Sequence, residues 1–423
     1  MSPADGSAAF APAAIAQDAL AQDALAQDGA GRRPLDLRHV VIQPAIAHPS
    51  SANGLHNVVR SLIAEQRAMG DDARLCLFSD DPDALTGIPA DCPAQRFPLG
   101  GPRLSGRSLT ISDATLDRLL DGAGPDTVVH IHGAVKPLFA ALARGLHRRG
   151  VAYGVTLHGQ CSHIYDITGR VRRRLPAAWL RVFDGPAFAR ARFVHAITEE
   201  EAAIVRRVAP TAAVRLLPNT AWSARRGALP APIPRAAPDG GRPTFGYCAR
   251  YEIEHKGVDL LIDGFAAYRR AGGRGVLELA GSGPARAELE RRANAHGLGT
   301  HIRIHGPVFG AEKAAMMAGW HYFILTSRFD VMPTGCLEAA LSGLPLVVTR
   351  ETGLVPYVEG HGAGFGVSAL TAEAVADALA RAERTGPGAW RTMTANAHRM
   401  VVAIGDWGRI AARLRAAAYG RPS

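Results

Sequence analysis

The sequence predicts an α/β protein with two domains, each a doubly wound parallel sheet, and two observations predict this class. From residue 38 onward, short β-branched runs alternate with Ala-, Leu- and Arg-rich segments of helical period, the pattern of parallel strands joined by crossover helices. The pattern stops at a proline-rich stretch, 229–243, and restarts after it. At 423 residues the chain also exceeds what one hydrophobic core usually supports.

The strands and helices follow from local composition. Helices are expected at 57–69 and 199–208, between strands of the first half. Strands are expected in the first half at 39–42, 74–78, 127–131, 153–157 and 193–197, and in the second half at 244–247, 276–280, 301–304, 322–325 and 346–349.

Composition shifts predict the domain boundaries. The tail 1–33 repeats Ala-Gln-Asp-Ala-Leu, and a period of five fits neither a helical nor a strand face, so we expect it to be disordered. Five prolines between 229 and 243 indicate a linker. The expected parts are the tail 1–33, a first domain 34–220, a linker 221–243, a second domain 244–400 and a closing segment 401–423.

Cysteine usage and hydropathy bear on the compartment. The five cysteines are scattered without a C-x-x-C pair, which argues against a disulfide framework and a zinc site. No run reaches the roughly 18 apolar residues of a membrane span, and the tail lacks the features of a signal peptide. These observations favour a cytoplasmic protein. The net charge of +10, mostly from arginine, suits nucleotides, nucleic acids or anionic lipids, or simply a solvated surface, and does not choose among them.

Two carboxylates and two cations follow strands of the second half. Asp330 and Glu338 lie on either side of a strand-to-helix transition in "SRFDVMPTGCLEAALSG", and Arg250 and Lys256 frame the loop before an expected helix. A surface ion-pair cluster and helix capping explain part of this. A ligand with hydroxyls at both ends and a diphosphate between them, a nucleotide sugar, explains all of it, because carboxylates accept hydrogen bonds from hydroxyls while cations hold phosphates. Thr334 and Gly335 would offer helix N-terminal N–H groups to the phosphates.

The chain resembles glycosyltransferase family 4, retaining enzymes of the GT-B fold whose motif carries two glutamates with seven residues between them. The likeness runs from about residue 38 to near the C-terminus and includes "HIHG", "VTLHG", "LPNT", "ARYEIEHKGVDLLIDGF", "LELAGSGP", "IRIHGPV" and "LEAALSGLPLVVT". "GRIAARLRAAAYG", after Trp407, resembles the closing helix of the family, which usually crosses back to the first domain.

The resemblance implies roles for the second-half residues. Glu338 would hold the ribose hydroxyls, and Asp330, one methylene shorter than the usual glutamate, would contact the transferred sugar. Arg250 and Lys256 would bind the diphosphate. Substrate binding is further expected at Gly283, Pro307, Val308, Thr334 and Gly335, with Pro307 and Val308 beside the base.

In the first half the resemblance places Asn53 and Gly54 where the family has two glycines near the donor phosphate and the acceptor. It places His158 against the donor sugar, although a single histidine at a strand end is more often structural. His130 and His132 share a strand face and could be metal ligands, but the sequence shows no third ligand. Since the family generally works without metal, neither a metal nor another cofactor is expected.

A basic segment with aromatic neighbours suggests a membrane contact. Four arginines precede the aromatic and apolar positions of an expected helix; the residues are Arg170, Arg172, Arg173 and Arg174, then Trp179, Leu180 and Phe183. Such a segment suits an anionic membrane carrying a lipid-linked acceptor, or it is an ordinary solvated helix face.

These patterns together indicate a retaining hexosyltransferase that moves a sugar from a nucleotide-diphosphate-sugar to an acceptor hydroxyl, in polysaccharide (exopolysaccharide) or glycolipid biosynthesis. Its expected partners are the donor, a glycan or lipid-linked acceptor and the inner membrane face, with no nucleic acid. The competing class is a catalytically impaired nucleotide-sugar-binding subunit of a glycan-assembly complex. Two other readings are weaker. Asp81-Pro82-Asp83 has the spacing of a GT-A metal motif but precedes no matching acceptor apparatus, and Gly281-Ser282-Gly283 is only a fragment of a dinucleotide fingerprint.

Overall fold

The computed structural model describes residues 33–42, 54–99, 103–104, 107–108, 110–161, 164, 174–238 and 242–416. Its chain divides into two compact units. The amino-terminal unit comprises Ala30–Pro230, Phe329–Leu337 and Ile404–Ser423, and the carboxy-terminal unit includes Ala231–Arg328 and Glu338–Ala403. The division at Pro230 falls inside the expected linker, whereas Phe329–Leu337, which the sequence assigns to the second domain, groups with the amino-terminal unit. The expected disordered tail lies almost entirely outside the described residues.

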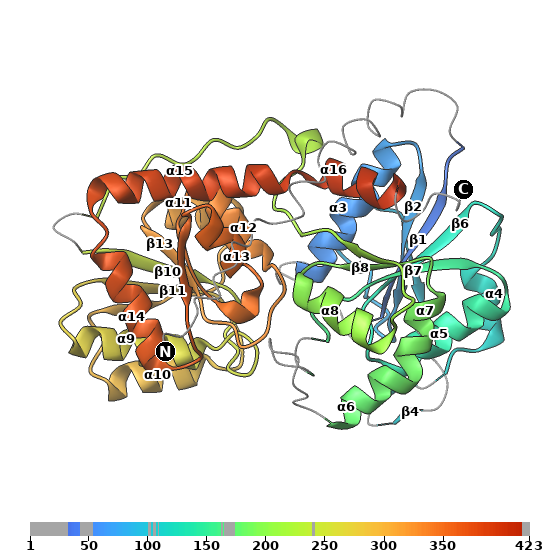
Figure 1. Ribbon diagram of the computed structural model, residues 1–423, viewed down its shortest axis with the longest axis horizontal. Helices are drawn as coiled ribbons and strands as arrows, with labels where there is room; N and C mark the ends of the chain where they lie inside the picture. The colour runs from blue at the N-terminus through green and yellow to red at the C-terminus, as the bar shows by residue number, and fades with distance from the viewer. Residues whose placement is uncertain are drawn as a thin grey trace, which may run out of the picture. The chain divides into compact units, whose positions relative to one another are not determined.

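The amino-terminal unit contains a parallel sheet of seven described strands in the order β3-β2-β1-β6-β7-β8-β9 (Figure 1). Their bounds are β1 Asp36–Ile42, β2 Asp72–Phe78, β3 Ala94–Phe97, β6 Thr127–His132, β7 Ala152–Thr156, β8 Phe193–Ala196 and β9 Val214–Leu216, with a separate hairpin of β4 Arg103–Leu104 and β5 Arg107–Ser108. The helical segments are α3 Gly54–Ala68, α4 Asp113–Leu119, α5 Pro137–Arg148, α6 Arg174–Trp179, the π-helix η1 Leu180–Asp184, α7 Gly185–Arg190, α8 Glu199–Val208, η2 Ala224–Arg226 and α16 Trp407–Leu414.

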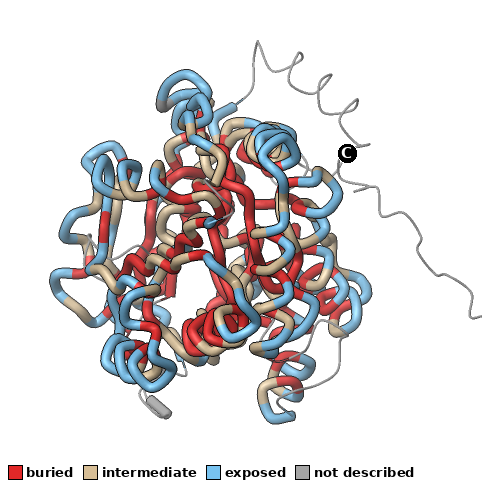
Figure 2. The backbone as a smooth tube through the Cα atoms, turned by 90° about the vertical axis from the view of Figure 1, so that its left-hand side faces the viewer, coloured by how far each residue is buried: buried red, intermediate tan, exposed pale blue. Residues whose placement is uncertain are grey.

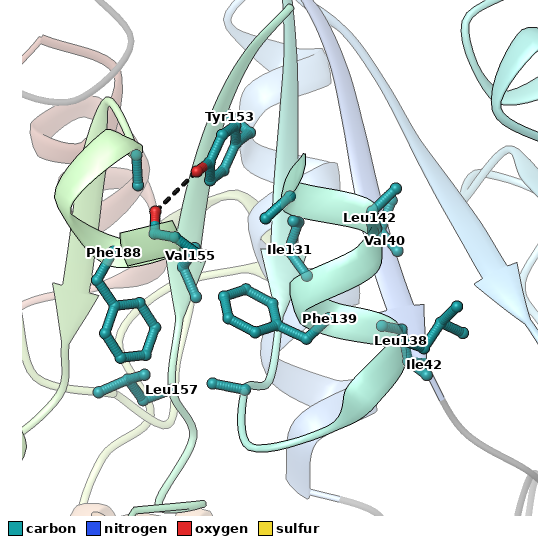
Figure 3. Packing of buried hydrophobic residues seen from close by; sticks show 14 of the residues in the cluster. Val40, Ile42, Ile131, Leu138, Phe139, Leu142, Tyr153, Val155, Leu157 and Phe188 are labelled. Carbon is teal, nitrogen blue, oxygen red and sulfur yellow. Dashed lines mark hydrogen bonds between the residues drawn. The ribbon is translucent and has the colours of Figure 1, made fainter. Parts of the chain in front are cut away.

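Alternating strand residues give this sheet two cores, because successive side chains point to opposite faces. One core packs α5 against β1, β6 and β7. Figure 3 shows Phe139 of α5 pointing toward Ile131 and Val155, and Leu142 beside Val40. The Tyr153 hydroxyl donates to the Ala187 carbonyl. The other core packs α3 and α16 on the opposite face; its members include Leu37, Val41, Leu62, Trp407 and Leu414.

The carboxy-terminal unit contains a parallel sheet of six described strands in the order β12-β11-β10-β13-β14-β15. The strands are β10 Thr244–Cys248, β11 Val276–Ala280, β12 Ile302–Ile304, β13 Tyr322–Leu325, β14 Leu346–Thr349 and β15 Gly364–Val367. The helical segments that begin in it are α9 Val258–Arg270, α10 Arg286–Ala295, α11 Gly310–Ala318, η4 Arg350–Thr352, α13 Val355–Gly360, α14 Ala372–Glu383 and α15 Pro387–Ile404. The division between the units falls within α12, Thr334–Leu341.

Burial follows the layer structure: the sheet strands are mostly buried and the outer faces of the helices are exposed (Figure 2). The predicted fold class, α/β with two doubly wound parallel sheets, is therefore confirmed. The five cysteines are free, with four buried and Cys248 half-buried. Among the described residues, no helix combines the length and the apolar character needed to cross a membrane.

Candidate functional site

Glu338 lies in the carboxy-terminal unit, near the carboxyl end of the central strand β10. Its Oε2 forms an ion pair with Nζ of Lys313, on α11, and the carboxylate is 40% exposed. Both groups act on the pKa of Cys248, the last residue of β10; burial raises this pKa, Lys313 lowers it and Glu338 raises it. Since one carboxylate offers about four lone-pair sites, Lys313 leaves acceptor capacity on Glu338 for hydroxyl groups of a ligand. No local sequence pattern pointed to Lys313.

Arg250 and Lys256 both interact electrostatically with one carboxylate, that of Glu252. Arg250, 48% exposed, pairs with Glu252 and lies with Nη2 3.3 Å from Nδ1 of His255. The pKa of Glu252 is lowered, first by its hydrogen bond with His255 and then by the charges of Arg250, His255 and Lys256. The structure thus gathers the two predicted phosphate-binding cations in one loop, with Glu252 partly neutralising them.

The loop that carries these cations is held by tight backbone packing. Gly257, at the N-cap of α9, has φ 59°, and a Cβ there would lie 2.2 Å from the carbonyl oxygen of Thr326. Arg328 donates to both carboxylate oxygens of Asp259, at 2.7 and 2.8 Å. A Cβ on Gly283 would lie 2.5 Å from the carbonyl oxygen of Tyr251. Gly283 is therefore required for the close approach of its loop to the cation loop, whatever contact it makes with a substrate.

The remaining predicted residues of the second half are divided between the two units. Pro307 is exposed and Val308 is buried, just after β12. Thr334 and Gly335 open α12, where the first N–H groups of a helix have no intrahelical acceptor. Asp330 groups with the amino-terminal unit, and its Oδ1 accepts from the N–H of Val331 at 3.1 Å.

Gly54 begins α3, and its predicted neighbour Asn53 lies outside the described residues. Within the amino-terminal unit, a Cβ on Gly54 would be 3.7 Å from Oγ1 of Thr334, an ordinary contact distance. The need for glycine at position 54 is therefore not steric in this structure.

His158 follows β7 in a strained backbone conformation. Its φ is 53°, in the left-handed region that costs about 1–3 kcal/mol for a residue with a Cβ. The N–H of the next residue, Gly159, donates to Oε1 of the buried Glu201 at 2.6 Å, and the N–H of Ile197 donates to Oε2 at 2.9 Å. Burial raises the pKa of Glu201 to about 7. Glu201 therefore fixes the loop of His158; the sequence signal was the capping pattern Thr-x-x-Glu from Thr198 to Glu201.

The structure supplies the histidine that sequence reasoning missed. Ring nitrogens of His39, His130 and His132 lie within 4.8 Å of one another, all three rings being buried. His39 is opposite His130 in the register of β1 and β6. A parallel pairing of two strands far apart in sequence cannot be predicted from either strand alone, so the sequence did not show that a third histidine accompanies His130 and His132.

The basic segment is described only in part, because Arg170, Arg172 and Arg173 lie outside the described residues. Arg174 opens α6, which continues through η1 into α7. Leu175 is 85% exposed, Val182 60% and Phe183 40%, so exposed apolar side chains follow Arg174 in the chain.

Comparison with known proteins identifies the class that this fold and site define. A family model described as "Glycosyl transferase 4-like domain" matches residues 53–220, and one described as "Glycosyl transferases group 1" matches residues 242–384. The chain belongs to the group 1 glycosyltransferases of the family 4 type, as the resemblance predicted.

Relatives with this similarity act on different sugars. A glycogen synthase of Paracidovorax citrulli is 31% identical over 169 residues, which cover 38% of this chain and 33% of that protein. The alpha-D-kanosaminyltransferase of Streptomyces kanamyceticus is 30% identical over 140 residues, covering 33% and 36%. A GDP-mannose-dependent mannosyltransferase of Mycobacterium tuberculosis that acts on phosphatidylinositol monomannoside is 29% identical over 148 residues, covering 33% and 38%. The aligned part of the chain spans about a third of the length of these relatives.

Solved structures match over nearly the whole chain. Sucrose-phosphate synthase from Thermosynechococcus elongatus has a TM-score of 0.65 at 18% identity, covering 90% of this chain and 97% of that one. Anabaena HepE in complex with UDP and glucose has a TM-score of 0.64 at 16% identity, covering 88% and 96%. The fold is GT-B, which confirms the predicted architecture.

Proposed function

We propose that the protein is a retaining glycosyltransferase that moves a hexose-type sugar from a nucleotide-diphosphate-sugar to an acceptor hydroxyl. The observation that carries the proposal is the charge arrangement of the carboxy-terminal unit. A half-exposed carboxylate, Glu338, lies near the carboxyl end of β10, and two cations, Arg250 and Lys256, share the loop after the same strand. Ligands of doubly wound sheets bind beyond the carboxyl ends of the strands.

The cations would stabilise the departing nucleoside diphosphate. Negative charge develops on the diphosphate as the bond between its oxygen and the anomeric carbon breaks, and preorganised cations lower the energy of that charge. The acceptor oxygen then bonds to the same face of the anomeric carbon, and its proton passes to the leaving phosphate oxygen. This path keeps the anomeric configuration without a covalent nucleophile. Thr334 and Gly335 would add backbone N–H donors to the phosphates.

Asp330 and His158 would contact the transferred sugar, as the resemblance implies. The strained backbone of His158 supports this role, because such strain collects at functional sites. Asp330→Ala is expected to lower kcat/KM by about tenfold or more, the cost of one charge-assisted hydrogen bond. Asp330→Glu, which restores the usual residue, tests whether the shorter side chain selects the donor sugar: kcat/KM should change differently for different sugars on one nucleotide.

Thermal unfolding with UDP-, GDP- and ADP-sugars tests the donor site directly. A ligand at 100 times its dissociation constant adds about 2.7 kcal/mol to stability. Glu338→Ala is expected to abolish this protection, whereas Glu312→Ala, an exposed carboxylate change in the same unit, is expected to keep it. An unchanged shift in Glu338→Ala would contradict the ribose role. The bound UDP of the HepE structure and the GDP-mannose dependence of the mannosyltransferase make both nucleotides necessary arms of this screen.

The competing function, a nucleotide-sugar-binding subunit without turnover, makes a different prediction in a transfer assay. An enzyme releases free nucleoside diphosphate and forms a glycosidic product with retained configuration, measured by proton NMR of the anomeric centre. A binding subunit shows thermal protection but releases no nucleoside diphosphate with any acceptor. Both functions require the donor-binding charges of Glu338, Arg250 and Lys256, so the transfer assay decides between them.

We further propose that the acceptor belongs to glycan or glycolipid synthesis, including exopolysaccharide, and that the protein works in the cytoplasm at an anionic membrane face, with neither metal nor other cofactor. The support is the exposed apolar group of Leu175, Val182 and Phe183 beside Arg174 and Arg181. Pelleting with phosphatidylglycerol liposomes is expected to exceed pelleting with phosphatidylcholine liposomes. Replacing Leu175 and Phe183 by Ser together should remove the difference; unchanged pelleting would remove the membrane proposal.

Activity that survives EDTA would support the absence of a metal.

A further inference from the structure

Three histidines of the amino-terminal unit, His39, His132 and His158, form a row of hydrogen-bonded rings that runs from the interior to His158. We call this row the His39 file. Nε2 of His39 lies 2.7 Å from Oε1 of Gln66, and Nδ1 of His39 lies 2.9 Å from Nε2 of His132. Nδ1 of His132 lies 2.8 Å from Nε2 of His158. Gln66, His39 and His132 are at most 1% exposed, and His158 alone is partly exposed. Since Nε2 of His158 is used by His132, Nδ1 is the ring nitrogen left for a ligand.

The sheet geometry explains why these rings meet. His130 and His132 are two residues apart on β6 and therefore share a face of the sheet. His39 is opposite His130 in the pairing of β1 with β6, and the helix α3 covers this face and supplies Gln66. The contact at the end of β7 then extends the file to His158.

The rings of this file are neutral near pH 7. Burial lowers the pKa of His39 to about 4 and that of His158 to about 3, and it lowers the pKa of His132 well below the usual value. A neutral imidazole carries one N–H, so two bonded rings must hold their protons in the same direction along the file. The tautomer of each ring is therefore coupled to that of the next.

A second file in the same sheet has a fixed direction. Nε2 of His195 lies 2.8 Å from the carbonyl oxygen of Leu217, which only accepts, so His195 is protonated at Nε2. Its Nδ1 then accepts from the Thr156 hydroxyl at 3.0 Å, and that hydroxyl accepts from Nε2 of His130 at 2.6 Å. His130 and His195 are thus both N–H at Nε2, without any contribution from Gln66.

The His39 file ends at the amide of Gln66, which changes what the file can do. An amide oxygen accepts a hydrogen bond but does not take up a proton at neutral pH, so the file cannot carry protons away from His158. The file can, however, fix which ring nitrogen of each histidine carries the proton. With Oε1 of Gln66 toward His39, each ring is N–H at Nε2, the tautomer that neutral imidazole side chains intrinsically prefer, and Nδ1 of His158 presents a lone pair.

We propose that Gln66, His39 and His132 are positioning residues that lock His158 as the Nε2–H tautomer, so that its Nδ1 accepts a hydrogen bond from a hydroxyl of the donor sugar. The contact with the sugar rests on the proposed function, whereas the lock itself does not. The lock makes His158 selective for a group that donates, because a hydroxyl satisfies the lone pair and a group without a proton does not.

A metal ion would be the other use of clustered histidines, and the surroundings disfavour it. Nε2 of His130 is committed to Thr156, and the facing nitrogens of His39 and His132 are already bonded to each other. Lys136, whose charge lowers the pKa of His158, is a cation in these surroundings and would repel a second one. A buried dication without a carboxylate carries a large desolvation cost.

The test reads tautomers in the ligand-free, full-length protein labelled with 15N-histidine, using long-range 1H–15N correlation spectra. The wild type is expected to show Nε2–H at His39, His132 and His158. In Gln66→Leu, an Nε2–H at His39 would be a buried donor without an acceptor, which costs more than an unpaired lone pair. The file is then expected to reverse, with His158 protonated at Nδ1, while His130 and His195 keep their tautomers as internal controls. Gln66→Glu keeps an acceptor and is expected to retain the wild-type pattern.

Activity provides a second readout. With the donor found by thermal screening, kcat/KM is expected to fall about tenfold in Gln66→Leu and to recover in Gln66→Glu, since a donor would face a donor at His158 in the first variant. Loss of transfer in the wild type would contradict the proposed function and leave the spectra to judge the lock alone.

Three outcomes would overturn the inference: an Nδ1–H tautomer at His158 in the wild type, an unchanged His158 tautomer in Gln66→Leu, or Zn²⁺ displacing the signals of His39 and His132. Should Gln66→Leu fail to fold, His39→Asn cuts the file at the same end and is expected to give mixed tautomers at His158. A single Nε2–H tautomer there would equally contradict the lock.

Discussion

Replacing Glu201 by Ala should destabilise the amino-terminal unit through two orphaned donors. The Glu201 side chain is fully buried and accepts from the N–H groups of Gly159, at 2.6 Å, and Ile197, at 2.9 Å. A buried donor left without a partner costs about 1–3 kcal/mol, so the two together cost about 2–6 kcal/mol in free energy of unfolding. Glu201→Gln keeps one amide oxygen and should lose about half of that, about 1–3 kcal/mol.

Urea unfolding followed by circular dichroism measures the loss, and amide hydrogen exchange locates it. The control is Glu199→Ala, two residues earlier on α8, whose carboxylate is exposed and lies 3.6 Å from Arg206; it should stay within about 0.5 kcal/mol of the wild type. Faster exchange of the Gly159 and Ile197 amides in Glu201→Ala is expected. Wild-type stability with unchanged exchange at both amides would refute the assignment of Glu201 as the anchor of the His158 loop.

Three further predictions concern charge, backbone and pH. Glu252→Gln should tighten binding of a nucleoside diphosphate by about fivefold, measured by calorimetry. The reason is that the partly buried carboxylate of Glu252 competes with the phosphates for Arg250, which costs about 1 kcal/mol of binding free energy. Weaker binding would show that Glu252 instead positions the cations. Gly257→Ala should lower the free energy of unfolding more than Gly297→Ala. Both glycines have positive φ (59° and 67°), but of the two new Cβ atoms only that at 257 would meet backbone, 2.2 Å from the carbonyl oxygen of Thr326. Equal losses would contradict the clash. Burial raises the pKa of Asp184 to about 7, so its contribution to stability is fully present below about pH 4 and is lost as the pH rises through 7. By linkage, the whole loss should be about 4 kcal/mol. In a denaturation series at pH 5 to 8, the free energy of unfolding should fall less steeply with pH in Asp184→Asn than in the wild type.

The fold was largely predictable because its signals are local. Buried strands such as β13 and β14 are continuous apolar or β-branched runs between turn residues, and α8 begins at a Thr cap followed by three glutamates. The elements that sequence reasoning missed lack these signals. β3 (Ala94–Phe97) contains Gln and Arg, β9 has three residues, and β15 contains two glycines.

The candidate site was predictable where its residues follow strands in sequence, as Arg250 and Glu338 do. Partners that reach the site from elsewhere were not. Lys313 is one lysine on a helix 25 positions before Glu338, and His39 meets His132 only through the pairing of β1 with β6. Such contacts depend on strand order and helix placement, which no local pattern carries. The steric role of Gly283 against Tyr251 was also missing from the sequence analysis, because it depends on the approach of two loops.

The packing of α16 on α3 has a consequence for how the protein is made. The hydrophobic cluster that holds α3 includes Trp407, Ile410 and Leu414, and Arg415 bonds the buried carboxylate of Asp71. During synthesis, the amino-terminal sheet leaves the ribosome long before these residues exist. The apolar side chains on one face of α3 therefore stay exposed until the C-terminal residues are synthesised. A protein truncated near residue 400 should depend on chaperones or aggregate.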